Sequence, residues 1–205
     1  IGDFITALPM AKVLKEQSYH KIIMLVSSIN APLAKNFDFI DGVIEYSNDT
    51  FALVKIIRSY KIDVSISAYI DNKLGLALFL SGIKTRIAPA TKIAQIFFNK
   101  TLKQKRSEVK KTEWQYNLDL LRVLNIDLEL KFARPLLNIK TTQKEPFIIF
   151  HVGSGGSSDG NLILDDYLKL AKKASAFIDI CFAFGPDDNE DKKYILKHID
   201  FNTII

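Results

Sequence analysis

An acidic residue stands near the start of the chain, between a glycine and a helix-like stretch: Gly2 and Asp3 precede residues 4–9. Free backbone N–H groups and the helix dipole favour an ionised carboxylate at a helix N-terminus. Such a carboxylate can accept a proton from a hydroxyl group, which is the role of a general base. The alternative is a purely structural helix cap, with Gly2 supplying the turn geometry. The spacing alone favours the cap.

A glycine- and serine-rich segment lies between an apolar run and an amphipathic stretch in the last third of the chain. Its loop residues are Gly153, Ser154, Gly155, Gly156 and Ser157. A loop of this kind after a strand brings backbone N–H groups and hydroxyls close to an anion, so it predicts a phosphate site. It is not a Walker loop, because no Gly-Lys-Ser/Thr follows, and it lacks the G-x-G-x-x-G fingerprint. A flexible loop between a strand and a helix is the alternative.

Residues 100–111 form a strongly basic segment. Its cations include Lys103, Lys105, Arg106, Lys110 and Lys111. Such a run is usually a solvated loop. The second interpretation is an electrostatic surface for an anionic lipid headgroup or for the phosphates of an acceptor. Nucleic-acid binding is not expected, because the run has no interleaved aromatic residues.

Composition limits the remaining possibilities. The 205 residues, 48% of them hydrophobic, suffice for one large domain or two small ones, and the net charge of +5 suits a phosphorylated or acidic partner. No metal site is expected, because there is no Asp-x-Asp triplet and no His or Cys ligand spacing. The single cysteine, Cys181, excludes an internal disulfide framework. No apolar stretch is long enough to cross a bilayer.

Short apolar runs alternate with amphipathic stretches along the whole chain, which is typical of an α/β protein with parallel strands. Strands are predicted at residues 22–27, 43–46, 63–67, 85–87, 147–151 and 179–184. Helices are predicted at residues 51–60, 72–81, 113–124, 164–176 and 190–198. Gly82 is expected to end the second of these helices, because glycine adopts the left-handed cap conformation without strain.

A polar segment at residues 135–146 separates two such α/β units and is typical of a linker. We therefore expect an N-terminal domain over residues 1–138, a linker over 139–146 and a C-terminal domain over 147–205. The chain begins within a motif and stops at an apolar pair of isoleucines. We expect a longer protein at both ends, with the first strand of the N-terminal domain missing and the C-terminal domain incomplete.

Several segments, in order along the chain, resemble the family 9 glycosyltransferases, which are heptosyltransferase-like enzymes. Members open with a strand, a Gly-Asp pair and a helix with a Leu-Pro pair, and residues 2–9 are similar. Their second domain opens with a strand and a His-Pro-Gly-Ser-Gly-Gly-like loop, and residues 147–157 are similar, with Val152 where proline is common. Residues 39–44, 60–64 and 81–87 resemble connecting segments of the family. The ordered set is more specific than any one of these motifs.

The resemblance implies a GT-B fold, in which two Rossmann-like domains with parallel sheets face each other across a cleft. It implies an inverting, metal-independent transfer of a sugar, namely heptose from an ADP-heptose-like donor, to the core of a lipopolysaccharide or lipooligosaccharide. Asp3 matches the family's general base, and the loop at residues 153–157 matches the site of the donor's diphosphate. Glu190 resembles the acidic residue that meets the nucleotide ribose in some members.

The same resemblance implies partners and a location. The expected partners are a nucleotide-diphosphate sugar, as substrate rather than cofactor, and an anionic glycolipid acceptor. Neither a cofactor nor a nucleic acid is expected. The expected location is the cytoplasm, with transient contact with the inner face of the inner membrane.

The chain departs from the family pattern after the glycine-serine loop. Many members carry a lysine there and then Asn-Trp-Pro, whereas this chain has Asp159, Gly160 and Asn161. The family's later Asp-x-Gly-x-x-His donor motif does not occur in the 205 residues. A non-catalytic module that binds a nucleotide or a sugar phosphate on the same fold is therefore an alternative. A Rossmann oxidoreductase is disfavoured, because the glycine loop lacks the fingerprint spacing.

Overall fold

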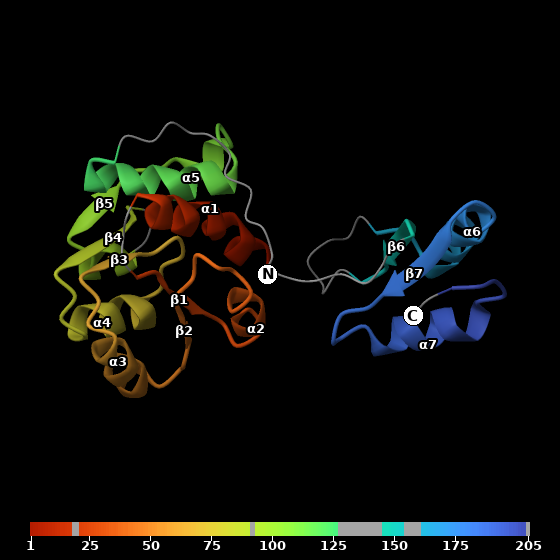
Figure 1. Cartoon of the computed structure of the whole chain (residues 1–205), viewed down its shortest axis with the longest axis horizontal. Coiled ribbons are helices and arrows are strands. Elements are labelled where there is room, and N and C mark those ends of the chain that lie inside the picture. The colour runs from red at the N-terminus through yellow and green to blue at the C-terminus, as the bar shows by residue number, and fades with distance from the viewer. Residues whose placement is uncertain (18–20, 91–92, 127–144, 154–160, 204–205) are drawn as a thin grey trace. The chain divides into compact units, whose positions relative to one another are not determined.

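The chain divides into two compact units, Ile1–Ile139 and Lys140–Ile205, which are described separately (Figure 1). The computed structural model describes residues 1–17, 21–90, 93–126, 145–153 and 161–203. Within these segments every strand pair is parallel, as the alternating sequence pattern predicted. Most of the predicted linker, residues 139–144, lies outside the described residues.

Strands and helices alternate along the first unit. Its strands are β1 (Ile23–Val26), β2 (Gly42–Glu45), β3 (Val64–Ile66), β4 (Thr85–Pro89) and β5 (Lys100–Leu102). Its α-helices are α1 (Gly2–Glu16), α2 (Ala31–Ala34), α3 (Thr50–Ser59), α4 (Asn72–Leu80) and α5 (Glu113–Asp119). Short 3₁₀-helices are η1 (Ile93–Phe97), η2 (Arg106–Glu108) and η3 (Leu120–Leu124).

The strands of the first unit pair as β1-β2 and as β3-β4-β5. Two adjacent residues of β4, Ile87 and Ala88, are fully buried on opposite faces of the three-stranded sheet. Ala88 packs in a cluster with Leu53 of α3, whereas Ile87 packs with Leu118 of α5. Helices therefore cover both faces of this sheet, which is the usual arrangement for parallel strands (Figure 1).

Helix α1 is fixed at both ends and interrupted in the middle. Phe4 and Leu8, four residues apart, lie on one face and pack in a core with β1 and α2. Pro9 lies inside the helix and has no N–H to donate to the carbonyl of Ile5. Near the C-terminus, Lys15 Nζ lies 2.8 Å from Asp41 Oδ1. That hydrogen bond, together with one from the Ile22 N–H, holds the pKa of Asp41 below its usual value.

The second unit is a parallel pair of strands with two helices. Its elements are β6 (Phe147–His151), α6 (Leu164–Ala174), β7 (Asp179–Ala183) and α7 (Asn189–His198). The two strands align with Phe147 opposite Asp179 and His151 opposite Ala183. Its core is formed by buried residues of β7 and both helices, namely Ala171, Ile180, Phe182 and Ile195, together with Val152, which directly follows β6.

The predicted elements all occur, one of them in altered form, whereas one short α-helix and one short strand were not predicted. The α-helix predicted for residues 113–124 ends at Asp119 and continues as the 3₁₀-helix η3. Gly82 has φ +77°, which confirms its predicted role at the end of α4. Helix α2 and strand β5 were not predicted. They are four and three residues long, too short to establish a hydrophobic period, and β5 falls in the basic segment.

Candidate active site

Asp3 lies in the first turn of α1, with an exposed side chain. The helix begins at Gly2 with Ile1 as its N-cap, so Asp3 is not the cap residue and the cap interpretation is wrong. Among the residues that the structure describes, the Asp3 carboxylate has no hydrogen-bond or ion-pair partner. Only the Asp3 backbone is held, since Thr6 Oγ1 donates to the Asp3 carbonyl at 2.9 Å. The carboxylate is thus free to receive a proton at the positive end of a helix dipole.

A buried asparagine of α5 contacts the N-terminal part of α1. Asn117 is 2% exposed, and its Nδ2 donates to the Thr6 carbonyl at 3.1 Å and to Thr6 Oγ1 at 3.3 Å. Its Oδ1 accepts from Arg106 Nη2 at 3.1 Å. Thr6 therefore connects Asp3 to a buried polar group on a neighbouring helix, and the backbone at Asp3 is positioned from outside its own helix.

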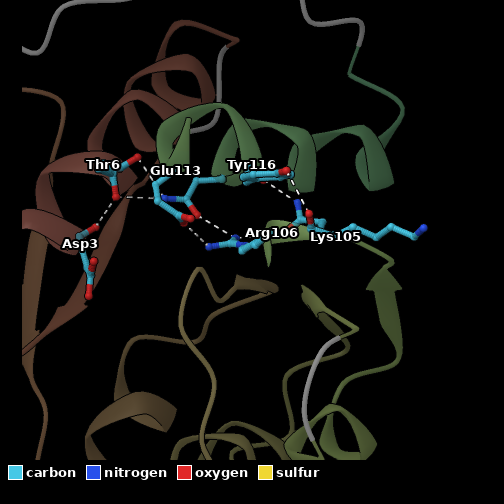
Figure 2. Close-up of polar contacts among 8 residues, drawn as sticks. Asp3, Thr6, Lys105, Arg106, Glu113 and Tyr116 are labelled. Carbon is cyan, nitrogen blue, oxygen red and sulfur yellow. Dashed lines mark hydrogen bonds and ion pairs between the residues drawn. The ribbon is translucent and has the colours of Figure 1, made fainter. Parts of the chain in front are cut away.

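Arg106 is the centre of the polar cluster beyond Asn117 (Figure 2). Its Nη1 lies 2.6 Å from Glu113 Oε2, and its Nε and Nη2 donate to Gln104 Oε1 at 3.1 and 3.0 Å. The guanidinium also lies over the Tyr116 ring, with Cζ 5.6 Å from the ring centroid. Planar geometry and several donors let one arginine bridge η2 and α5. No pattern in the sequence separated this arginine from its basic neighbours.

Gly153, at the start of the predicted phosphate loop, has a packing role of its own. A Cβ placed on Gly153 would lie 1.8 Å from Asp188 Oδ2, so no other residue fits without displacing that carboxylate. Asp188 Oδ2 in turn accepts the N–H of Gly185 at 2.6 Å. The other predicted loop residues, Ser154, Gly155, Gly156 and Ser157, lie outside the described residues. Sequence reasoning passed over Asp188, which is one of several acidic residues in its loop.

A pocket of about 470 Å³ lies where the glycine-serine loop leaves and rejoins the described part of the second unit. Its walls are Val152, residues 161–165, Asp191 and Tyr194. Asn161 Nδ2 donates to the Val152 carbonyl at 3.3 Å, and the Tyr194 hydroxyl donates to Asp165 Oδ1 at 2.7 Å. The bond to Asp165 raises the pKa of Tyr194. Carboxylates in these walls can accept hydrogen bonds from sugar hydroxyls.

Glu190, predicted to meet the nucleotide ribose, lies in the first turn of α7. Its exposed carboxylate is 2.7 Å from Lys193 Nζ. It is not part of the pocket wall, whereas the adjacent Asp191 is. The resemblance pointed to the first turn of α7 but could not show which of the two consecutive acidic residues, Glu190 or Asp191, lines the pocket.

The described residues contain no group of three or more His, Cys, Asp or Glu side chains placed to hold a metal ion. No helix among them has the length and apolar character that crossing a bilayer requires.

Comparison with known proteins gives one related sequence. No protein-family model matches the chain. A protein of Haemophilus influenzae named "Putative glycosyltransferase" is 33% identical to it over 228 aligned residues. The alignment covers 97% of this chain and 65% of the relative, so the chain spans slightly less than two thirds of that protein's length.

Solved structures with low sequence identity share the fold. A glycosyl transferase of family 9 from Veillonella parvula matches 99% of this chain and 65% of its own, with a TM-score of 0.83 and 14% identity. ADP-heptose lipopolysaccharide heptosyltransferase II of E. coli matches 97% and 66%, with a TM-score of 0.80 and 16% identity. An E. coli heptosyltransferase solved with ADP matches 100% and 71%, with a TM-score of 0.72 and 15% identity.

Proposed function

The chain has the α/β fold of the family 9 glycosyltransferases, as the sequence resemblance predicted, and from this premise we propose that it belongs to a metal-independent, inverting glycosyltransferase. The proposed reaction moves a sugar, heptose from an ADP-heptose-like donor, to an anionic glycolipid of a lipopolysaccharide core. The name of the Haemophilus relative supports sugar transfer. The names of the E. coli structures, which include ADP-heptose and ADP, support this donor.

The observation that carries the proposal is the exposed carboxylate of Asp3, which has no partner in the described part of the chain and stands on a backbone held by Thr6 and Asn117. In the proposed step, an Asp3 oxygen accepts the proton of an acceptor hydroxyl. The hydroxyl oxygen forms a bond to the anomeric carbon, and the bond from that carbon to the diphosphate breaks. The diphosphate leaves with the bonding electrons, and a single displacement inverts the configuration. A carboxylate on a fixed backbone suits this role because general bases act by position first.

The leaving diphosphate requires stabilisation of its developing charge. We assign this to the backbone N–H groups of residues 153–157 and to the hydroxyls of Ser154 and Ser157, which can serve without a metal. Glu190 remains the candidate for the ribose contact on similarity, and Asp191 is a second candidate because it lines the pocket.

Replacing Asp3 tests the proposal. Asp3→Asn keeps the shape of the side chain and removes its ability to take a proton, so kcat should fall by about 10²-fold or more. The matched control is Asp38→Asn, since Asp38 is also exposed and lies in the same unit. Transfer is measured as ADP release together with formation of glycosylated acceptor, and NMR of the product gives the anomeric configuration. Unchanged transfer in a folded Asp3→Asn chain would exclude Asp3 as the base.

A non-catalytic module that binds a nucleotide or a sugar phosphate is the second candidate function. Two observations favour it: Asp159 and Gly160 stand where many members have a lysine, and the Asp188 carboxylate lies against Gly153. The enzyme would convert a donor and an acceptor to products, whereas the module would only bind them. Saturable binding of ADP with no product from any donor and acceptor pair would support the module over the enzyme.

A further inference from the structure

A second pocket, of about 330 Å³, lies in the first unit directly after the carboxyl end of β5. Its lining includes five cationic side chains, those of Lys103, Lys105, Lys110, Lys111 and Arg122. Only two carboxylates, those of Glu108 and Asp119, share the lining, which leaves an excess of three positive charges. A concave surface with charges of one sign concentrates ligands of the opposite sign.

The two carboxylates organise the cations rather than neutralise them all. Asp119, only 6% exposed, is held between Lys111 and Arg122, and the Arg122 Nε lies 3.0 Å from its Oδ1. Glu108 is similarly shared by Lys105 at 2.9 Å and Lys110 at 2.6 Å. Lys103, at the same wall, has no such partner among the described residues. Each carboxylate balances the charge of one of its two cations, so a net positive charge remains at both carboxylates.

Two residues of the pocket wall belong to the hydrogen-bonded cluster around Arg106, which extends through Asn117 to Thr6 near Asp3. Gln104 and Tyr116 line the pocket, and Gln104 Nε2 donates to the Tyr116 carbonyl at 2.6 Å. Gln104 also accepts from Arg106, which contacts Asn117 and through it Thr6 (Figure 2). Ligands of parallel sheets bind beyond the carboxyl ends of the strands. The pocket therefore lies on the side of the first unit where an acceptor for Asp3 would bind.

We propose that this pocket binds a phosphate group and that, if the proposed transferase function holds, the phosphate belongs to the anionic acceptor. Phosphate oxygens accept short, charge-assisted hydrogen bonds from lysine and arginine. The lysines of the basic segment are exposed, but they stand over a defined wall, formed by the buried Asp119 and by the hydrogen-bonded Gln104 and Tyr116. By binding the phosphate, the pocket would position the acceptor so that the hydroxyl group to be glycosylated lies near Asp3.

The first experiment measures binding of inorganic pyrophosphate by calorimetry to the full chain saturated with ADP, which occupies the proposed diphosphate site at residues 153–157. The pocket variant combines Lys103→Gln and Lys110→Gln, and the control combines Lys55→Gln and Lys73→Gln, two exposed lysines on α3 and α4. Both variants lose the same charge. We expect the pocket variant to bind about tenfold more weakly and the control to differ by less than about twofold. Equal weakening in both variants, or none in either, would overturn the proposal.

The second experiment identifies the source of the phosphate and separates this site from the transferase activity. Sedimentation with phosphatidylcholine vesicles containing phosphatidic acid should be lost in the pocket variant and kept in the control. Loss of pyrophosphate binding without loss of vesicle binding would refute a lipid acceptor and leave a site for free phosphate. Asp3→Asn should keep both kinds of binding, so failed transfer with normal binding would count against the enzyme alone.

Discussion

At the scale of single residues, the candidate base is held by its backbone and not through its carboxylate. Thr6 fixes the carbonyl of Asp3, and Asn117 fixes Thr6 from α5. The sequence identified Asp3 because an acidic residue after glycine at a helix start is a recognisable pattern. It could not identify Asn117, because an asparagine within a helix is usually solvent-exposed, and only tertiary packing buries it here.

Asn117→Ala tests whether this contact positions the base. The variant removes two donor contacts to Thr6 and one of the two acceptors of Arg106 Nη2, so the free energy of unfolding should fall by about 1–3 kcal/mol. Because Asp3 would lose its support, kcat should also fall about tenfold while the KM for the donor changes little. Denaturant unfolding followed by Trp114 fluorescence and steady-state kinetics measure the two effects.

The control for that variant is Asn72→Ala, because Asn72 is exposed at the start of α4. It should leave the stability and kcat nearly unchanged. Full kcat in an Asn117→Ala chain that is measurably less stable would show that Asn117 serves the fold and has no role in positioning Asp3.

At the scale of helices and strands, most of the architecture follows from local pattern. Alternating apolar and amphipathic segments predicted parallel strands, and the turn at Gly82 was predicted from glycine's freedom to adopt positive φ. The pattern failed where elements were short, as for α2 and β5. Side-chain contacts between elements, such as that of Asp188 with Gly153 in the loop after β6, produce no periodic pattern in the sequence, so they could not be predicted from it.

The contact between Gly153 and Asp188 joins the loops that follow β6 and β7, and it can be tested by a double-mutant cycle. Gly153→Ala should destabilise the second unit by about 1–3 kcal/mol, because the new Cβ would overlap the carboxylate. Asp188→Ala removes the obstacle, so adding Gly153→Ala to it should cost much less. Hydrogen exchange in β6 and β7 measures the three variants. Strict additivity would show that the two residues are not in contact.

At the scale of the whole chain, each unit has its own hydrophobic core. Ile87, Leu118 and Leu121 are buried in the first unit, whereas Phe182 and Ile195 are buried in the second. A core residue acts through the neighbours it packs against. The parallel sheets and the division into units are visible in the sequence as repeated strand and helix patterns, but the membership of each core is set by packing.

Ile195→Ala tests this division. Truncating a fully buried isoleucine should cost about 2–5 kcal/mol, and the loss of hydrogen-exchange protection should be greatest in β6, β7 and α6. Leu121→Ala is the reciprocal variant and should act mainly on β4, α1 and α5. The prediction fails if either truncation lowers protection to the same degree in both units.

The proline within α1 decides which interactions hold the candidate base in place. Pro9 leaves the Ile5 carbonyl without a helical donor, so the backbone ladder is interrupted two turns after the helix begins. Near the C-terminus of α1, the ion pair between Lys15 and Asp41 holds the helix. The opening turns are therefore held mainly by their neighbours: Phe4 packs in the core with β1 and α2, and Asn117 donates to the Thr6 carbonyl. The position of the Asp3 carboxylate thus depends on contacts between elements more than on the hydrogen bonds of its own helix.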